Sequence, residues 1–197
     1  MAAPEDYLDA RVRDLLGAIA ARTPAPAGGS VAAIVVAMAA ALAAMAARFS
    51  DEQWEEAGGA IAQAEALRAR VAPLALADAQ AYGKALEALR QPKDRDTSVR
   101  NEVLGRALTE AAAVPLEIAG IASDVALLAA EIAGRGNLNL RGDAAAAAVL
   151  AEAGARIAAN LVAINLAATE EDERVARAKA LTAAASAAAR RALAPAP

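Results

Sequence analysis

The sequence contains neither cysteine nor histidine among its 197 residues. Their absence excludes disulfide bonds, cysteine nucleophiles, imidazole general bases and the zinc sites built from Cys and His. Any general acid or base in this protein must therefore be an aspartate, glutamate, lysine or tyrosine side chain.

Aromatic residues and an excess of positive charge are also lacking. The chain has one Trp, two Tyr and one Phe, and its 24 acidic residues outnumber its 20 basic residues, for a net charge of -4. A basic field for phosphates and aromatic platforms for base stacking are both missing, so we expect no nucleic-acid partner. The first residues, MAAPEDYLDARVRD, are acidic where a secretory signal is basic, which favours a cytoplasmic protein.

Alanine is abundant, and it is the strongest helix former. Because β-branched residues are sparse and alternating strand patterns are absent, the sequence predicts an all-α fold. The length suits one core, and no linker-like composition shift divides the chain. We therefore expect a single-domain multi-helix bundle over residues 1–197, with residues 191–197 as a candidate disordered tail.

A central Ala-rich apolar helix is expected over about Val31 to Ala47. This run is shorter than the roughly 20 residues of a membrane span and is mostly alanine, so we expect no membrane partner. Its larger side chains follow one helical stripe, which suits either a helix wrapped by others or a helix packed on a partner subunit. The stripe consists of Val31, Ile34, Val35, Met38, Leu42, Met45 and Phe49.

The loop TPAPAGGS, residues 23–30, leads directly into this central helix. Glycines that leave backbone N–H groups bare at a helix N-terminus form a plausible ligand cradle, although Pro and Gly also punctuate plain connectors. Further helices are expected over residues 7–21, from about 60 to 90, from 99 to 133 with a kink at Pro115, from 143 to 169, and through a terminal segment that begins near EEDERVARAKA.

Two groups of carboxylates differ in their positions on these helices. Asp78 and Tyr82 fall on the inward face of a stripe that runs from Leu67 to Leu89, one turn apart. Burial raises the pKa of such a carboxyl, which makes Asp78 a candidate general acid or base, and a structural hydrogen bond to tyrosine or a pair with arginine is the alternative. A heptad row beside another apolar stripe is expected to face water: Glu110, Glu117, Asp124 and Glu131.

Polar residues in the last third of the chain allow two interpretations each. Asp143 precedes AAAAAVLAEA, where aspartate is a preferred N-cap. Asn160 and Asn165 interrupt an apolar helix, and being five positions apart they cannot share the centre of one face. They either bind a ligand or act as structural amides, and Asn137 in GRGNLNLRGD is either a turn residue or part of a stretch of exposed amides.

Six stretches, taken together and in this order, resemble motifs of the cyclodeaminase/cyclohydrolase family of tetrahydrofolate enzymes. They are TPAPAGGSVAA, DAQAY, PKD, AAAVPLEIA, GNLNLRGD and NLVAINL, and they extend from about Thr23 to Leu166. The resemblance implies an all-helical subunit, commonly a homodimer, which needs no redox cofactor or essential metal. Its substrate would be 5-formiminotetrahydrofolate, closed to 5,10-methenyltetrahydrofolate with release of ammonia, or 5,10-methenyltetrahydrofolate, opened by water to 10-formyltetrahydrofolate.

The resemblance also implies roles for individual residues. Asp78 and Asp143 match the motif aspartates, so one would be the acid or base and the other an anchor for the pterin or the cation. Tyr82 would form a wall of the site, and Lys93 would meet the glutamyl carboxylates. The remaining implied substrate-binding residues are Gly28, Gly29, Ser30, Asn137, Asn160 and Asn165.

This chain departs from the family pattern at three places. Ala27 replaces the first glycine of the triplet, Gly142 replaces a serine, and FSDEQWEEAGG stands where many members carry a lysine-rich stretch. The lost positive charge leaves a second class of function open, a non-catalytic folate-binding or scaffolding helical dimer of the same fold.

Overall fold

The computed structural model describes residues 6–90, 97–166 and 172–195. Within these ranges the chain forms only helices, and the all-α prediction is confirmed. The elements are η1 (Tyr7–Asp9), α1 (Val12–Ile19), α2 (Gly28–Arg48), α3 (Ala57–Val71), α4 (Leu74–Leu89), α5 (Thr97–Arg135), η2 (Leu138–Leu140), α6 (Arg141–Leu166) and α7 (Glu173–Leu193).

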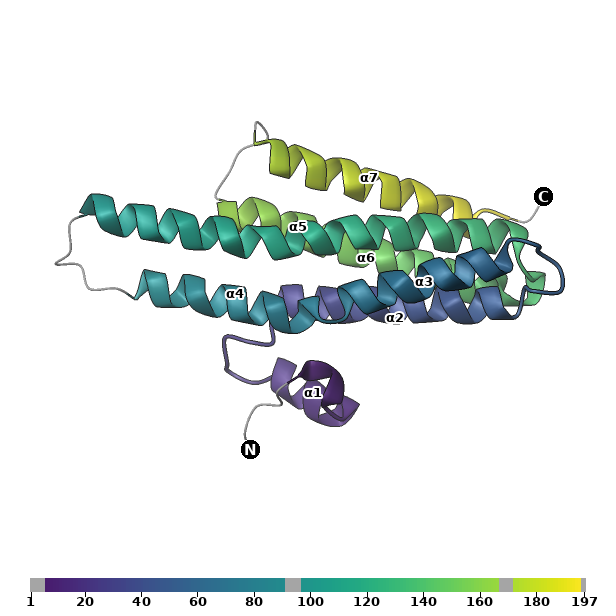
Figure 1. Ribbon diagram of the computed structural model, residues 1–197, viewed down its shortest axis with the longest axis horizontal. Coiled ribbons are helices and arrows are strands. Elements are labelled where there is room, and N and C mark those ends of the chain that lie inside the picture. Colours follow the sequence, from purple (N-terminus) through teal and green to yellow (C-terminus); the bar gives the residue numbers. More distant parts are fainter. Residues whose placement is uncertain (1–5, 91–96, 167–171, 196–197) are drawn as a thin grey trace.

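The long helices α2, α5 and α6 lie side by side and form the body of an elongated bundle (Figure 1). Helices α3 and α4 follow one another along α2 and α5, and α7 covers α5 and α6 on the opposite side. Helix α1 lies outside the bundle, beside the part of α2 that is nearer its N-terminus (Figure 1).

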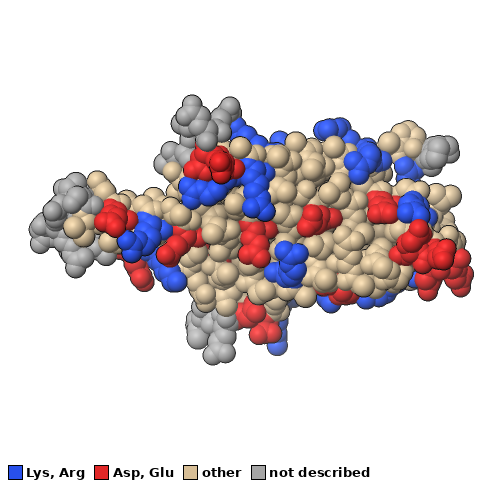
Figure 2. All heavy atoms as spheres, turned by 45° about the horizontal axis from the view of Figure 1, so that its top comes forward, with Lys and Arg blue, Asp and Glu red and all other residues tan. Residues whose placement is uncertain are grey.

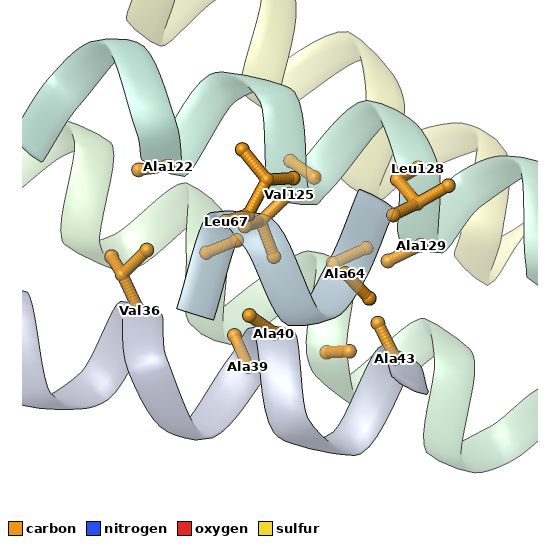
Figure 3. Close-up of a cluster of buried hydrophobic side chains, with 14 of the residues drawn as sticks. Val36, Ala39, Ala40, Ala43, Ala64, Leu67, Ala122, Val125, Leu128 and Ala129 are labelled. Atoms are coloured by element: carbon orange, nitrogen blue, oxygen red, sulfur yellow. The ribbon is translucent and has the colours of Figure 1, made fainter. Parts of the chain in front are cut away.

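The core is built from small side chains. Nine of the thirteen buried residues of α2 are alanines, and Val36 is its largest fully buried side chain. Figure 3 shows Ala39, Ala40 and Ala43 of α2 facing α3 and α5, whose larger side chains, Leu67 and Val125 among them, fill the space between the helices. Small residues on α2 thus let the neighbouring helices approach closely while the interior stays filled.

The outer face of α2 carries its larger side chains. Met38 is 54% exposed and Phe49 is 60% exposed, and the members of the stripe between them are half-buried. Helix α6, which packs beside α2, also exposes Ile157 and Ile164. The structure thus leaves most of the stripe on the outer face of α2, and only Ile34 of the predicted set is buried.

Three helical stretches are long and apolar enough, by length and composition alone, to cross a membrane. They are Gly28–Arg48, Asn101–Arg135 and Leu138–Leu166. In the structure these stretches are the neighbours that form the bundle, and each buries its alanines against the others.

Several predicted helix boundaries were wrong. The first helix is not continuous from residue 7 to 21, because it divides into η1 and α1. The long helix expected over residues 60–90 is interrupted between α3 and α4 at Pro73, which has no N–H to continue the ladder. Helix α3 begins at Ala57, slightly before the expected start near residue 60, and the preceding segment SDEQWEE forms turns.

Three further expectations concern the carboxylate row, the start of α6 and the end of α7. The heptad row of carboxylates is exposed, as predicted. Helix α6 begins at Arg141, so Asp143 lies in its first turn and not at the predicted N-cap position, where its charge still suits the positive end of the helix dipole. Helix α7 continues to Leu193, into the segment considered as a disordered tail.

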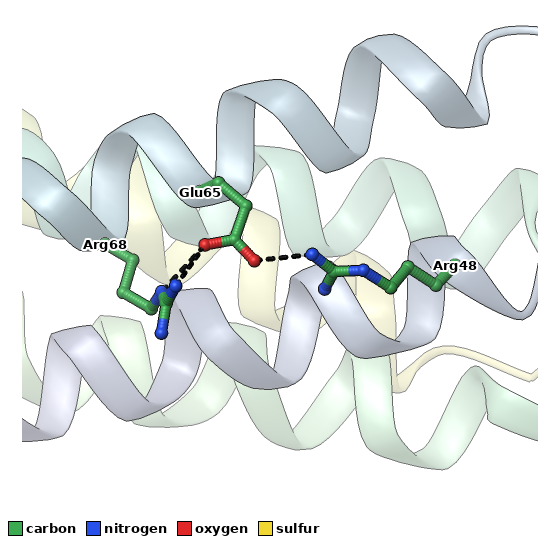
Figure 4. Close-up of polar contacts among 3 residues, drawn as sticks. All are labelled: Arg48, Glu65 and Arg68. Carbon is green, nitrogen blue, oxygen red and sulfur yellow. Dashed lines mark hydrogen bonds and ion pairs between the residues drawn. The ribbon is translucent and has the colours of Figure 1, made fainter.

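An ion-pair cluster joins α2 to α3 near the end of α2. Glu65 contacts Arg48 at 2.6 Å and Arg68 at 2.5 Å (Figure 4). Both arginine side chains are about half exposed, so the cluster contributes little to stability compared with the alanine core.

Candidate functional site

A buried carboxyl group lies against the N-terminus of α2. Asp78, on α4, is 8% exposed, and its Oδ2 accepts a hydrogen bond of 3.3 Å from the hydroxyl of Ser30. The carboxyl group lies so close to Gly29 that a Cβ atom at this position would overlap it. Glycine is therefore required at residue 29 because of this close approach, and the loop in front of the central helix serves to seat Asp78.

Burial raises the pKa of Asp78 above its ordinary value. Hydrogen bonds from the side chain and the backbone of Ser30 act in the opposite direction, and the effect of burial is larger. Among the described residues, neither of the structural alternatives is present, because no arginine pairs with Asp78 and no hydrogen bond joins it to Tyr82. The group has the environment expected of a general acid or base.

Ala27 fits its position in the loop without strain. Its backbone is extended, with φ at -123° and ψ at -166°, a conformation open to any residue. The loss of the first family glycine therefore does not distort the backbone that supports Gly28 and Gly29.

Sequence reasoning missed Tyr7, which comes from the N-terminal segment. Tyr7 is 9% exposed and belongs to the same buried cluster as α2. Burial and the charge of Asp78 both raise the pKa of Tyr7, so the two side chains lie near one another. The only available signal was its residue type, because Tyr7 stands at the very start of the first expected helix, residues 7–21.

A cavity of about 230 Å³ opens beside Asp78. Tyr82, 39% exposed, forms part of its wall. The amide nitrogen of Asn165 donates a hydrogen bond of 2.9 Å to the carbonyl oxygen of Ala111, which fixes this side chain at the cavity edge. The lining residues are Ala27, Gly28, Gly29, Asp78, Tyr82, Ala111, Leu161, Ile164 and Asn165.

The structure places two of the predicted site residues at the opposite end of α2. The backbone N–H of Asn137 donates to the Ser50 hydroxyl at 2.8 Å, and its side chain donates to the carbonyl oxygen of Phe49 at 2.9 Å. Asp143 follows shortly afterwards, in the first turn of α6. A helix of 21 residues is about 30 Å long, so a single chain does not bring Asn137 or Asp143 to Asp78.

Asn160 lies in a different hollow from Asp78. It lines a groove of about 410 Å³ between α6 and α7, together with Arg156, Lys179 and Thr182. Lys93 lies outside the described residues, so its predicted role stays a prediction. Within the described part of the chain, no three acidic side chains are grouped so that they could hold a metal ion.

Comparisons with known proteins agree with the resemblance in the motifs. Residues 11–189 match the family described as Formiminotransferase-cyclodeaminase. The chain is 34% identical over 170 residues to formimidoyltransferase-cyclodeaminase of Mus musculus, covering 82% of this chain and 31% of that protein. It therefore spans about a third of the length of this relative.

Two further relatives are similar to the chain over most of their length. The methenyltetrahydrofolate cyclohydrolase of Methylorubrum extorquens is 32% identical over 162 residues, which cover 78% of each chain. The crystal structure of formiminotetrahydrofolate cyclodeaminase from Thermotoga maritima superposes with a TM-score of 0.82 at 27% identity and covers 94% of each chain.

Proposed function

Because this chain belongs to the formiminotransferase-cyclodeaminase family of folate one-carbon enzymes, we propose that it acts on a one-carbon unit carried by tetrahydrofolate. The reaction is either the closure of 5-formiminotetrahydrofolate to 5,10-methenyltetrahydrofolate with release of ammonia, or the opening of 5,10-methenyltetrahydrofolate to 10-formyltetrahydrofolate. The observation that carries this proposal is the Asp78 carboxyl, buried without a cationic partner in the described residues, at the edge of an open cavity.

Both reactions pass through a tetrahedral carbon between two folate nitrogens and involve a cationic, amidine-like group. Asp78 supports this chemistry in two ways, because its ionised form stabilises the cation and its raised pKa allows it to exchange a proton with a folate nitrogen or water. Gly28 and Gly29 would hold the ligand near the N-terminus of α2, and Tyr82 and Asn165 would define its orientation.

The cavity of a single chain is too small for a complete folate. Its volume of about 230 Å³ is below the roughly 300 Å³ at which ordinary small-molecule sites begin, and Ile164, on its lining, is 62% exposed. The space suits the bicyclic pterin end of the substrate, and the wall beside Ile164 would be completed from outside the chain.

A second copy of the chain is the proposed source of that wall. The outer stripe of α2 and the exposed side chains of α6 lie on adjacent helices, and Leu161 and Ile164 belong both to this apolar face and to the cavity. Large apolar faces of this kind mark interaction sites. A homodimer formed through the face would cover it and close the cavity.

The two α2 helices of this dimer would run antiparallel. In a parallel arrangement the acidic turns after Ser50 would meet one another and the helix dipoles would align, and both effects are unfavourable. The antiparallel arrangement brings the partner's Asn137 and the partner's Asp143 toward Asp78. It thereby gives the predicted site residues a way to act together, although each chain holds them about 30 Å apart.

The first experiment measures turnover directly. Purified protein is mixed with 5,10-methenyltetrahydrofolate and, separately, with 5-formiminotetrahydrofolate, and the near-ultraviolet absorbance of the methenyl compound is followed against a protein-free control. Faster loss in the first mixture identifies a cyclohydrolase, and a gain in the second identifies a cyclodeaminase. No change in either mixture would instead support the non-catalytic folate-binding or scaffolding dimer.

A further inference from the structure

The turns between α2 and α3 carry a concentration of negative charge that the proposed reaction does not use. Residues 51–56, here called the acidic loop, contain Asp51, Glu52, Glu55 and Glu56, all of them exposed. Figure 2 shows acidic side chains gathered at this end of the molecule. Glu56 pairs with Arg135, whereas the other three have no ion pair within the described part of the chain.

The N-terminal segment is equally unexplained. The segment from η1 through α1, residues 7–19 and here called the arm, is held to its own bundle by buried Tyr7 and by Leu15. Its opposite side is apolar and uncovered, because Val12 is 65% exposed and Leu16 is 60% exposed. Helix α1 has only eight residues and no buried side chain, and a helix this short gains most of its stability from packing, so a partner on this face would stabilise it.

Two exposed arginines accompany the apolar side of the arm. Arg11 immediately precedes α1, and Arg13 lies one turn from Leu16 on the helix. Neither forms an ion pair among the residues that the structure describes. Asp9 and Asp14 are exposed as well, so the arm as a whole carries no net charge. Asp14 lies two residues from Leu16 and so faces away from it, whereas Arg13 lies beside it, so the apolar side of the arm is flanked by Arg13.

At the far end of α2, the surface next to the acidic loop offers the complementary features. Phe49 is 60% exposed and Leu138, on η2, is 73% exposed. The hydrogen bonds of Asn137 to Phe49 and Ser50 hold η2 beside the start of the acidic loop. Exposed apolar side chains and unpaired carboxylates thus meet at this end.

We propose that the arm of each subunit docks on the acidic-loop end of a second copy, an inference that rests on the antiparallel dimer described above. Val12 and Leu16 would pack on the partner's Phe49 and the partner's Leu138, while Arg11 and Arg13 face the partner's acidic loop. The two features lie at opposite ends of α2, about 30 Å apart, so they do not meet within one chain. The two-fold axis repeats the contact, and each dimer contains it twice.

This docking gives a physical reason for the acidic sequence at this place in the chain. The carboxylates would serve to recognise the partner's arm, and the arm would be fixed against a second bundle as well as its own. Since the arm holds Tyr7 near Asp78, formation of the dimer would also fix Tyr7 in its place beside this carboxyl group.

The absence of cysteine makes the contact testable by cross-linking, because introduced thiols have no competitors. In a variant that carries both Leu16→Cys and Leu138→Cys, we expect oxidation or a short bis-maleimide to join two chains into a covalent dimer. Each single variant is the matched control, since like positions lie at opposite ends of the antiparallel dimer and do not cross-link. Cross-linking of Leu16→Cys to itself would overturn the proposal.

A charge exchange tests the polar half of the contact. Arg13→Glu should raise the dimer Kd about two- to thirtyfold at low salt, because each dimer contains the pair twice, and adding Glu52→Arg should restore it. Leu16→Glu should raise the Kd about a hundredfold or more, whereas Leu89→Glu, an exposed leucine on α4, should leave it unchanged.

Sedimentation of the unmodified protein separates failure of the arm contact from failure of the dimer. A dimer that gives no cross-link in the double variant and the same Kd for Arg13→Glu and Leu16→Glu would overturn the arm contact alone. A monomer at all concentrations would overturn the dimer and the arm contact together. The folate assay is read separately, so the proposed reaction stands or falls on its own measurement.

Discussion

The buried polar groups at the two ends of α2 differ in how fully they are hydrogen-bonded. At the first end, the carboxyl of Asp78 is buried against Gly29, Ser30 is its only hydrogen-bond donor among the described residues, and its pKa is raised. At the second end, buried Ser50 donates to the carbonyl oxygen of Ala46 at 2.8 Å and accepts from the N–H of Asn137. Burial disfavours the ionised form of the Asp78 carboxyl. The Ser50 hydroxyl, in contrast, has a partner both as donor and as acceptor.

This difference separates a reactive site from a structural joint. A buried polar network in which every member has a partner stabilises the fold and fixes its geometry. A buried carboxyl with a raised pKa weakens the fold when it is ionised, and a protein retains such a group when its chemistry is needed. Substitutions at the Asp78 end should therefore affect turnover most, and substitutions at the Ser50 end should affect stability.

Replacing Asp78 with asparagine should have the largest effect. Asp78→Asn keeps the shape of the side chain but removes its proton exchange and its charge, so we expect turnover to fall about 10²- to 10⁴-fold. The same change removes a desolvated carboxylate, so the melting temperature at neutral pH should stay the same or rise. Activity and thermal unfolding of the same preparation check both halves, and a folded variant with full turnover would refute the assignment.

The close approach at Gly29 should give the next largest effect. Gly29→Ala places a Cβ within the volume of the Asp78 carboxyl, and relieving this overlap should cost about 1–3 kcal/mol of stability and displace the carboxyl. Gly28→Ala is the matched control, because the nearest atom to its Cβ is Leu161 Cδ1 at 3.9 Å, an ordinary contact. Denaturant unfolding of both variants provides the test, and equal stabilities would contradict this account of Gly29.

The Ser50 network should respond in stability, by a smaller amount. Ser50→Ala leaves the part-buried N–H of Asn137 without its partner, which should lower the free energy of unfolding by about 1–2 kcal/mol. Ser186→Ala removes a hydroxyl that is only part-buried, next to Glu152, and should cost less. If Ser186→Ala lowered the free energy of unfolding as much as Ser50→Ala, burial of the hydrogen-bonded hydroxyl would not determine the size of the loss.

Local patterns in the sequence predicted much of the first end of α2. The Pro and Gly residues of the loop located the helix start, and the three- and four-residue spacing correctly placed Asp78 inward. The same spacing was wrong for Tyr82, which was predicted on the inward face but is 39% exposed beside the cavity. These features depend on neighbours in the chain, which a sequence records directly. Pro73 is a local signal of the same kind, and it should have indicated the break in the helix predicted over residues 60–90.

Features that depend on packing between distant segments were less accessible. The burial of Tyr7 beside Asp78 joins segments about 70 residues apart, and no periodicity reports such a contact. The stripe on α2 was identified correctly, but whether it faced the core or a partner depended on the alanines being small enough for the close-packed interior. The separation of Asp143 from Asp78 likewise follows from the antiparallel course of the long helices.

The smallest effect we expect is a difference in pH dependence between two aspartates of opposite character. The folded-state pKa of Asp78 is raised, so its contribution to stability is full at low pH and is lost as pH rises above the ordinary carboxyl range. Asp172, at the N-terminus of α7, has its pKa lowered to about 2 by hydrogen bonds from Arg174, so its contribution is present at neutral pH and is lost as pH falls toward 2. Relative to the unmodified protein, Asp78→Asn should therefore gain stability as pH rises from 3 to 7, while Asp172→Asn should lose it. Thermal unfolding at a series of pH values gives, for each variant, the slope of its relative stability against pH. Slopes of the same sign would mean that burial does not raise the pKa of Asp78.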